Sequence, residues 1–383
     1  MKASVRVFRR ASRPRSLSSA SAAFASGALA VALLHATAAL PAAPTPTTTA
    51  VPTATPAPSA APARSASPVP SAAPTPSAAP SPADPIDEVV VSGEQPGPGL
   101  WKVSKGSHVL WILGTLSPLP KKMTWRSGEV EAIVAKSKEV IGQESVSTNV
   151  GFFRGITLLP SLLRARYNPD GAMLKDVLPP DLYARWLRLK AAYIGNDTSI
   201  EKWRPMFAAI RLYQKAIDRS DLTQSNIVWP VISKAADAHG VHVTKLSVKV
   251  DVGNPKQTIR DFTQTPRAAD VACLAATIDR LETDLGNMKL RANAWAVGDL
   301  STLERLPAPD QVAKCVEAFT SGPGLQDKLT AGRARYFDEW LGAAEAALSR
   351  NDVSFATLPM SELVGASGRL AKLQAQGYSI EKP

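Results

Sequence analysis

Ser117 ends the stretch of this chain whose residue types come closest to a catalytic loop. An apolar run at residues 111–113 leads into Gly114 and Thr115, and Pro118 follows the serine directly. A glycine at the end of a strand lets the backbone approach a ligand closely, so this turn predicts a binding site. A serine nucleophile needs a base within hydrogen-bond reach, and neither a Gly-x-Ser-x-Gly elbow nor a His–Asp pattern surrounds Ser117. The pattern therefore favours a polar loop residue over a nucleophile.

Glu144 is a candidate acid or base, because it ends a second apolar segment that predicts a core strand at residues 139–144. A carboxylate at a strand end can transfer protons or serve as the base for Ser117. The alternative is a structural role in a hydrogen bond or an ion pair. The four histidines do not have the spacing of metal ligands: His35 precedes the folded region, His108 lies in a strand, and His239 and His242 straddle a helix stop.

The elements that position these residues follow from hydrophobic periodicity. Residues 100–104 and 108–113 predict a β-hairpin, Ser127 begins a helix, and 139–144 completes a βαβ unit. The middle of the chain predicts helices at 152–167, 180–193, 200–217 and 224–239, then a strand at 241–250. The remaining segments predict helices at 266–297, 310–319 and 325–349, a strand at 353–358, a helix within 365–376, and a last strand at 378–380.

The expected fold class is α/β (α+β). We expect a central mixed sheet built from N- and C-terminal segments, with a large helical insertion between them. In such a sheet the loop after Leu113 lies near the loop after Leu358.

The first 43 residues predict a signal peptide. Six cations precede residue 20 without an acid, an apolar stretch follows at 22–34, and Ala36-Thr37-Ala38 offers small residues for cleavage. The alternative is an uncleaved membrane anchor, although the apolar stretch is shorter than a membrane span requires. The sequence thus predicts a periplasmic or secreted protein with no membrane span after cleavage.

Residues 44–95 predict a disordered linker rich in Pro, Ala, Thr and Ser, because they contain too few large apolar residues to form a core. The linker either provides reach or acts as an inert spacer. The folded domain is assigned to residues 96–383, with a start near Ile86 or Pro96. The net charge of +11 falls to about +5 without the six signal-peptide cations, and no basic stripe with interleaved aromatics predicts nucleic-acid binding.

Cys273 and Cys315 are the only cysteines. In an exported protein two cysteines on separate helices favour one disulfide, and the alternative is two buried thiols.

Several short motifs together resemble the TraB/PrgY/GumN family, in particular its exported GumN-like branch. They are LWKV at 100–103, WILGT at 111–115, PLP at 118–120, WRS at 125–127, KWRP at 202–205, AWAVGDL at 294–300 and AQGYSI at 375–380. The family is similar in fold to erythromycin-esterase and ChaN-like proteins and to the TIKI metalloproteases. The resemblance implies a divalent-metal-dependent hydrolase or peptidase with two Gly-x-x-His motifs and acidic residues.

This chain departs from the family at both motifs. Ser117 stands at the first histidine position, and Pro359 and Glu362 stand at the glycine and histidine of the second motif. Ser247 replaces the acidic residue after the middle strand, and Arg335-Tyr336 replaces an Arg-Asn pair. Carboxylate and hydroxyl oxygens suit hard cations and hold zinc poorly, so no metal or other cofactor is expected, or at most a weakly bound divalent metal.

Glu144, Asp299 and Arg335 are what remains of the implied site. Asp299 follows Gly298 and is also typical of a helix cap. Arg335 could bind an anion or form a surface ion pair. Glu144 and Glu362 could form an acid/base pair.

Three functions follow from these patterns. The first is a pseudoenzyme, a non-catalytic binding or assembly module of the cell envelope whose partner is an unknown envelope protein or peptide. The second is a hydrolase or peptidase with a degenerate carboxylate site formed by Glu144, Glu362 and Ser117. The third is a structural envelope protein organised by its linker, in which deletion of residues 44–85 matters more than mutation of Glu144.

Overall fold

The structure is a computed structural model of the 383-residue chain. It describes residues 89–142, 145–148, 158, 160–161, 163–250, 253–264, 267–306, 315–316, 325–364 and 368–383. The proposed signal peptide, most of the linker and Glu144 lie outside these residues, as do half of the helix expected at 152–167 and most of the helix expected at 310–319.

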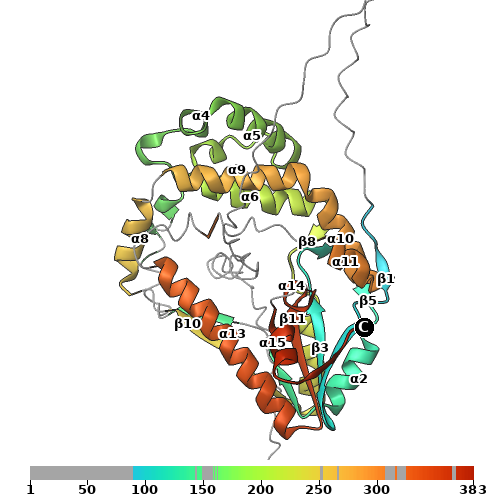
Figure 1. Cartoon of the computed structure of the whole chain (residues 1–383). Coiled ribbons are helices and arrows are strands. Elements are labelled where there is room, and N and C mark those ends of the chain that lie inside the picture. Colours follow the sequence, from blue (N-terminus) through green and yellow to red (C-terminus); the bar gives the residue numbers. More distant parts are fainter. Residues whose placement is uncertain are drawn as a thin grey trace, which may run out of the picture.

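A six-stranded mixed sheet joins the two ends of the chain. The strands are β2 (Leu100–Lys105), β3 (His108–Thr115), β6 (Glu139–Ile141), β9 (His242–Thr244), β11 (Val353–Pro359) and β12 (Ser379–Glu381). Their order is β12-β2-β3-β11-β6-β9, with β11 parallel to both β3 and β6. The α/β fold class, with a sheet built from both ends of the chain, is confirmed (Figure 1).

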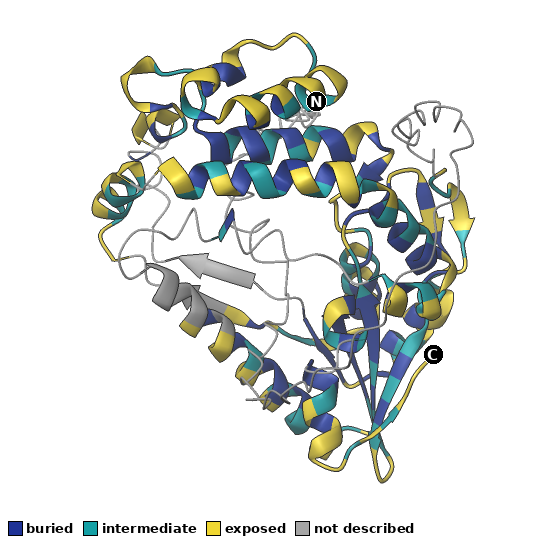
Figure 2. Ribbon diagram, turned by 45° about the horizontal axis from the view of Figure 1, so that its top comes forward, coloured by how far each residue is buried: buried dark blue, intermediate teal, exposed yellow. Residues whose placement is uncertain are grey.

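The central strand β11 is buried on both faces from Ser354 to Leu358, as expected for a strand covered by helices on both sides (Figure 2). On its two sides lie β3 and β6, which α2 (Gly128–Lys136) connects. The predicted hairpin is also confirmed, because β2 pairs antiparallel with β3 from Leu100–Leu113 to Lys105–His108.

Helices of the insertion form a second layer away from the sheet (Figure 1). They are α4 (Leu174–Val177), α5 (Pro180–Tyr193), α6 (Pro205–Arg219), α8 (Pro255–Thr263) and α9 (Arg267–Thr283), with the 3-10 turns η1 (Pro169–Gly171) and η2 (Ser199–Lys202). This layer has its own apolar core around Trp186, Leu212 and Leu274, separate from the core of the sheet.

The strand predicted at 241–250 is wrong as one element. It divides into β9 and β10 (Ser247–Val250), and β10 pairs with β7 (Ser145–Thr148) outside the main sheet. The division has a geometric cause, because the pairing register shifts by one residue between the β6–β9 and β7–β10 pairs.

Two of the predicted helices also differ in extent. The helix predicted at 266–297 divides into α9 and α10 (Leu285–Val297) at Asp284, whose buried carboxylate receives hydrogen bonds from Arg291 at 2.7 and 3.0 Å. The helix predicted from residue 224 begins only at Trp229 as α7 (Trp229–His239), because the Asn226 side chain accepts the first backbone N–H groups.

The C-terminal helices cover one part of the sheet. They are α13 (Leu325–Arg350), α14 (Met360–Val364) and α15 (Arg369–Ala375), with α11 (Leu300–Arg305) beside α14. Besides the β7–β10 pair, the described residues form two more small sheets, β1 (Gly93–Gln95) with β5 (Met123–Trp125) and β4 (Leu119–Pro120) with β8 (Leu222–Thr223). Among the described helices none combines the length and apolarity that a membrane crossing requires.

Candidate functional site

The two loops that the sequence analysis singled out meet at one edge of the sheet. In the parallel pair β3–β11, Gly114 is opposite Leu358 and Thr115 is opposite Pro359. The Thr115 hydroxyl donates a hydrogen bond to the Leu358 carbonyl over 3.3 Å, which ties the two strand ends together. The expectation that the two loops lie side by side is therefore confirmed.

Gly114 is packed tightly by side chains of the protein itself. A Cβ atom at this position would lie 2.2 Å from Sδ of Met360 and 3.0 Å from Cδ1 of Leu363, both on α14. The indole N–H of the buried Trp295 donates to the Gly114 carbonyl at 2.8 Å. A larger residue here would displace the Met360 side chain, because α14 comes close to the strand end.

Ser117 is exposed at the tip of the first loop, where a cis peptide bond joins it to Pro118. The chain then enters β4, which pairs with β8 of the helical insertion. Its hydroxyl makes no hydrogen bond to another residue in the described part of the chain. No base is thus paired with Ser117 among these residues.

Glu362 lies on α14, and both of its carboxylate oxygens face Arg369. Oε1 is 3.4 Å from Nη1 of the guanidinium, and Oε2 accepts the backbone N–H of Arg369 at 3.3 Å. The side chain of Glu362 is 13% exposed and that of Arg369 is 2% exposed. This carboxylate therefore faces an internal cation.

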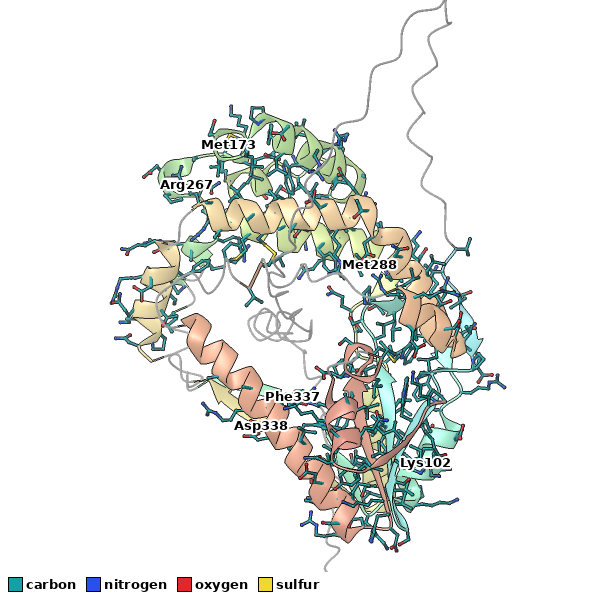
Figure 3. All side chains as sticks on the ribbon, in the orientation of Figure 1. Lys102, Met173, Arg267, Met288, Phe337 and Asp338 are labelled. Carbon is teal, nitrogen blue, oxygen red and sulfur yellow. A yellow bond between two sulfur atoms is a disulfide. The ribbon has the colours of Figure 1, made fainter. Side chains whose placement is uncertain are left out.

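Arg369 occupies a box of aromatic rings on α13. Its guanidinium carbon lies 4.9 Å from the ring centroid of Tyr336, 4.7 Å from Phe337 and 5.8 Å from Trp340. Phe337 projects from the side of α13 that faces α15 (Figure 3). Ring faces attract a cation, so the box and Glu362 hold the charge together.

Gly368 brings the two short helices into contact. A Cβ atom there would lie 2.2 Å from the carbonyl oxygen of Glu362 and 3.1 Å from its Cα atom. These are backbone atoms, which cannot move aside as a flexible side chain can. The glycine thus fixes α15 against α14 and places Arg369 beside Glu362.

Arg369 was not among the site residues predicted from the sequence. The signal was present in two places. One is the aromatic face of residues 336, 337 and 340 at helical spacing, and the other is the Gly-Arg pair whose arginine follows Glu362 by seven residues. Neither pattern alone predicts a buried cation, because the contact forms only when the fold brings α13 and α15 together.

Asp299 caps α11. Its carboxylate accepts hydrogen bonds from the backbone N–H of Thr302 at 3.1 Å and from the Ser301 hydroxyl at 2.8 Å. The bonds from Thr302 and Ser301 lower the pKa of Asp299 to about 2. All of these contacts fit the helix-cap alternative of the sequence analysis.

The other candidate residues have separate places. Arg335 is exposed on α13, Ser247 is exposed at the start of β10, and the disulfide between Cys273 and Cys315 lies in the core of the helical layer (Figure 3). The predicted disulfide is confirmed. Glu144 lies outside the described residues.

Glu139 is a buried carboxylate that sequence reasoning did not consider. It lies at the opposite end of β6 from the two loops, where it accepts hydrogen bonds from the Thr244 hydroxyl and from the Asn351 amide at 3.2 Å. Arg350 approaches the same carboxylate at 3.6 Å. Its partners are those of a structural carboxylate.

The described residues of the two loops do not fit a divalent metal. They supply one carboxylate, and that carboxylate is already paired with Arg369. Throughout the described ranges no three His, Cys, Asp or Glu side chains are grouped to hold a metal ion. A side chain that binds a metal ion must also lie away from other cations, which would repel the metal.

The model of the TraB/PrgY/gumN family matches residues 99–382. The chain belongs to the TraB/PrgY/gumN family. The match covers the sheet from β2 to β12 together with the helical insertion, so both loops lie inside it. A search of curated proteins and a search of solved structures found no match. Membership in the TraB/PrgY/gumN family thus rests on the family model over most of the chain.

Proposed function

We propose that this chain is an exported, non-catalytic binding or assembly module of the cell envelope that uses a TraB/PrgY/gumN domain without its metal chemistry. The observation that carries the proposal is the pairing of Glu362 with Arg369. According to the family resemblance, Glu362 stands where a metal-ligating histidine is expected. A carboxylate beside an internal guanidinium is a poor ligand for a metal ion, because the fixed positive charge repels a second cation.

The first loop supports the same proposal. Ser117 stands at the other expected histidine position and is exposed, with no base paired to it among the described residues. Tyr336, which replaces the asparagine of an expected Arg-Asn pair, is used as a wall of the box around Arg369. Two of the three replaced positions, 336 and 362, therefore contact the same buried cation, Arg369.

The N-terminal sequence supports the proposed location. A signal peptide at 1–43 and a linker up to residue 95 favour a domain in the periplasm or outside the cell, at a distance from the membrane. There it binds an envelope protein or peptide and needs no cofactor.

The test is hydrolysis by the purified chain. Peptidase and esterase activities are measured on a panel of peptides and esters, with and without chelator, beside a matched Glu362→Gln variant. We expect no turnover above that of the variant. Turnover that chelator abolishes, and that is lost in Glu362→Gln while this variant is still folded by thermal unfolding, would instead establish a hydrolase with a degenerate carboxylate site, in which Glu144 and Glu362 act with Ser117.

A further inference from the structure

Arg369 places a full positive charge at the loop where the family resemblance predicts a metal ligand. Among the described residues it is the most deeply buried cation, with an exposed fraction of 2%. Buried charges are rare unless something nearby stabilises them, and here the stabilising groups are Glu362 and the aromatic box of Tyr336, Phe337 and Trp340.

The pairing leaves the charge incompletely neutralised. Nε and Nη1 of Arg369 are buried and lack a hydrogen-bond partner, and the Glu362 carboxylate oxygen that faces Nη1 is 3.4 Å away. A charge-assisted hydrogen bond is shorter, at about 2.7–2.9 Å. The guanidinium therefore keeps a strong positive potential at the position that faces residue 362.

This potential acts against any second cation at the loop. A divalent ion bound by a side chain at position 362 would stand a few ångströms from the guanidinium, because the present side chain of Glu362 already contacts it. Like charges at such a distance repel strongly in a poorly solvated site.

We propose that Arg369 is the resident cation of this loop: it takes the place of the family's metal as the partner of residue 362 and excludes divalent metals. The inference rests on the proposed function, because the expected ligand position comes from the family resemblance. The competing explanation is that Arg369 only packs α15 against α13. In that case restoring the ligands restores the metal, whatever the charge at position 369.

The experiment restores the two histidines with and without the cation. Zinc binding to the full chain is titrated by calorimetry for Ser117→His/Glu362→His, and for the same pair combined with Arg369→Met or with Arg369→Lys. Methionine fills the aromatic box without charge, and lysine keeps the charge. Thermal unfolding of each variant verifies that it is folded, and Arg369→Gln serves as a second neutral variant if Arg369→Met does not fold.

We expect at least ~100-fold tighter zinc binding by the neutral triple variant than by the double variant or the lysine variant. Tight zinc binding by the double variant, with Arg369 intact, would overturn the inference. The same holds if the neutral triple variant binds no zinc, because repulsion would then not be what excludes the metal. These outcomes are separate from the proposed function, which fails if the unmodified chain carries a catalytic metal.

Discussion

Single residues decide how α14 and α15 are held together. The counter-charge comes from Glu362, the close backbone contact from Gly368 and the buried cation from Arg369. The first of the three was identified in the sequence through a family resemblance. Nothing in the sequence indicated that the residue seven positions later would be its partner.

The substitution Glu362→Gln is expected to destabilise the protein. It removes the negative charge that faces a guanidinium of 2% exposure, and an unpaired buried charge costs about 2–4 kcal/mol. Urea unfolding monitored by tryptophan fluorescence measures the change. The double variant Glu362→Gln/Arg369→Met is expected to recover most of the loss, and a cycle without coupling between the two sites would contradict the ion pair.

Two glycines test the close contact between α14 and α15. Gly368→Ala is expected to lose about 1–3 kcal/mol, because its Cβ atom would lie 2.2 Å from a backbone oxygen. The matched control is Gly342→Ala on the exposed face of α13, where a Cβ meets nothing within 4 Å. That change should stabilise the protein by about 0.5–1 kcal/mol, since alanine favours a helix interior. Equal effects in thermal unfolding would argue against the proposed contact.

At the scale of elements, much of the fold could be predicted from periodicity. Local hydrophobic patterns alone predict the β2–β3 hairpin, α2, α13 and β11, without any knowledge of distant contacts. The helix stops at Gly240 and Gly298 were also predictable, because both adopt the left-handed conformation that glycine favours.

Elements set by distant partners could not be predicted in the same way. The break between β9 and β10 depends on a register shift against β6 and β7, which are about 100 residues away in the sequence. The break between α9 and α10 depends on the buried Asp284–Arg291 pair. For the site, the meeting of the two loops followed from topology, whereas Arg369 required the packing of α15 on α13.

The N-terminus of α11 gives a prediction about pH. Hydrogen bonds from Thr302 and Ser301 lower the pKa of Asp299 from 3.8 to about 2. Because folding lowers this pKa, the charged carboxylate stabilises the fold at pH values above the pKa of Asp299 in the unfolded chain. The contribution is therefore present at neutral pH and is lost as pH falls from about 4 through 2. Melting temperatures of the protein and of Asp299→Asn are compared at neutral pH and near the lowered pKa, at about pH 2. The difference should shrink at the lower pH, and a constant difference would contradict the cap.

At the scale of the whole molecule, the described part of the chain has two main apolar cores. One lies around the sheet and the other lies between the helices of the insertion, and a small cluster that includes Leu222 and Met288 forms a third group. Figure 3 shows Met288 on α10, between the helical layer and the sheet. The disulfide belongs to the helical core alone.

Loss of the disulfide should therefore affect the two cores unequally. Replacing Cys273 and Cys315 by alanine is expected to destabilise the helical layer by about 2–4 kcal/mol, because the crosslink no longer restricts its unfolded chain. Hydrogen exchange then shows faster exchange in α6 and α9 and little change in β3 and β11. A uniform acceleration in both layers would show that they unfold as one unit.

In our proposal an internal ion pair has taken over the place of a metal. The most direct test is metal analysis of the purified, unmodified chain, by elemental analysis as isolated and after incubation with zinc or manganese and desalting. We expect well under one metal ion per chain in every case. Stoichiometric zinc or manganese that survives desalting, and that chelator removes together with peptidase or esterase activity, would contradict the account.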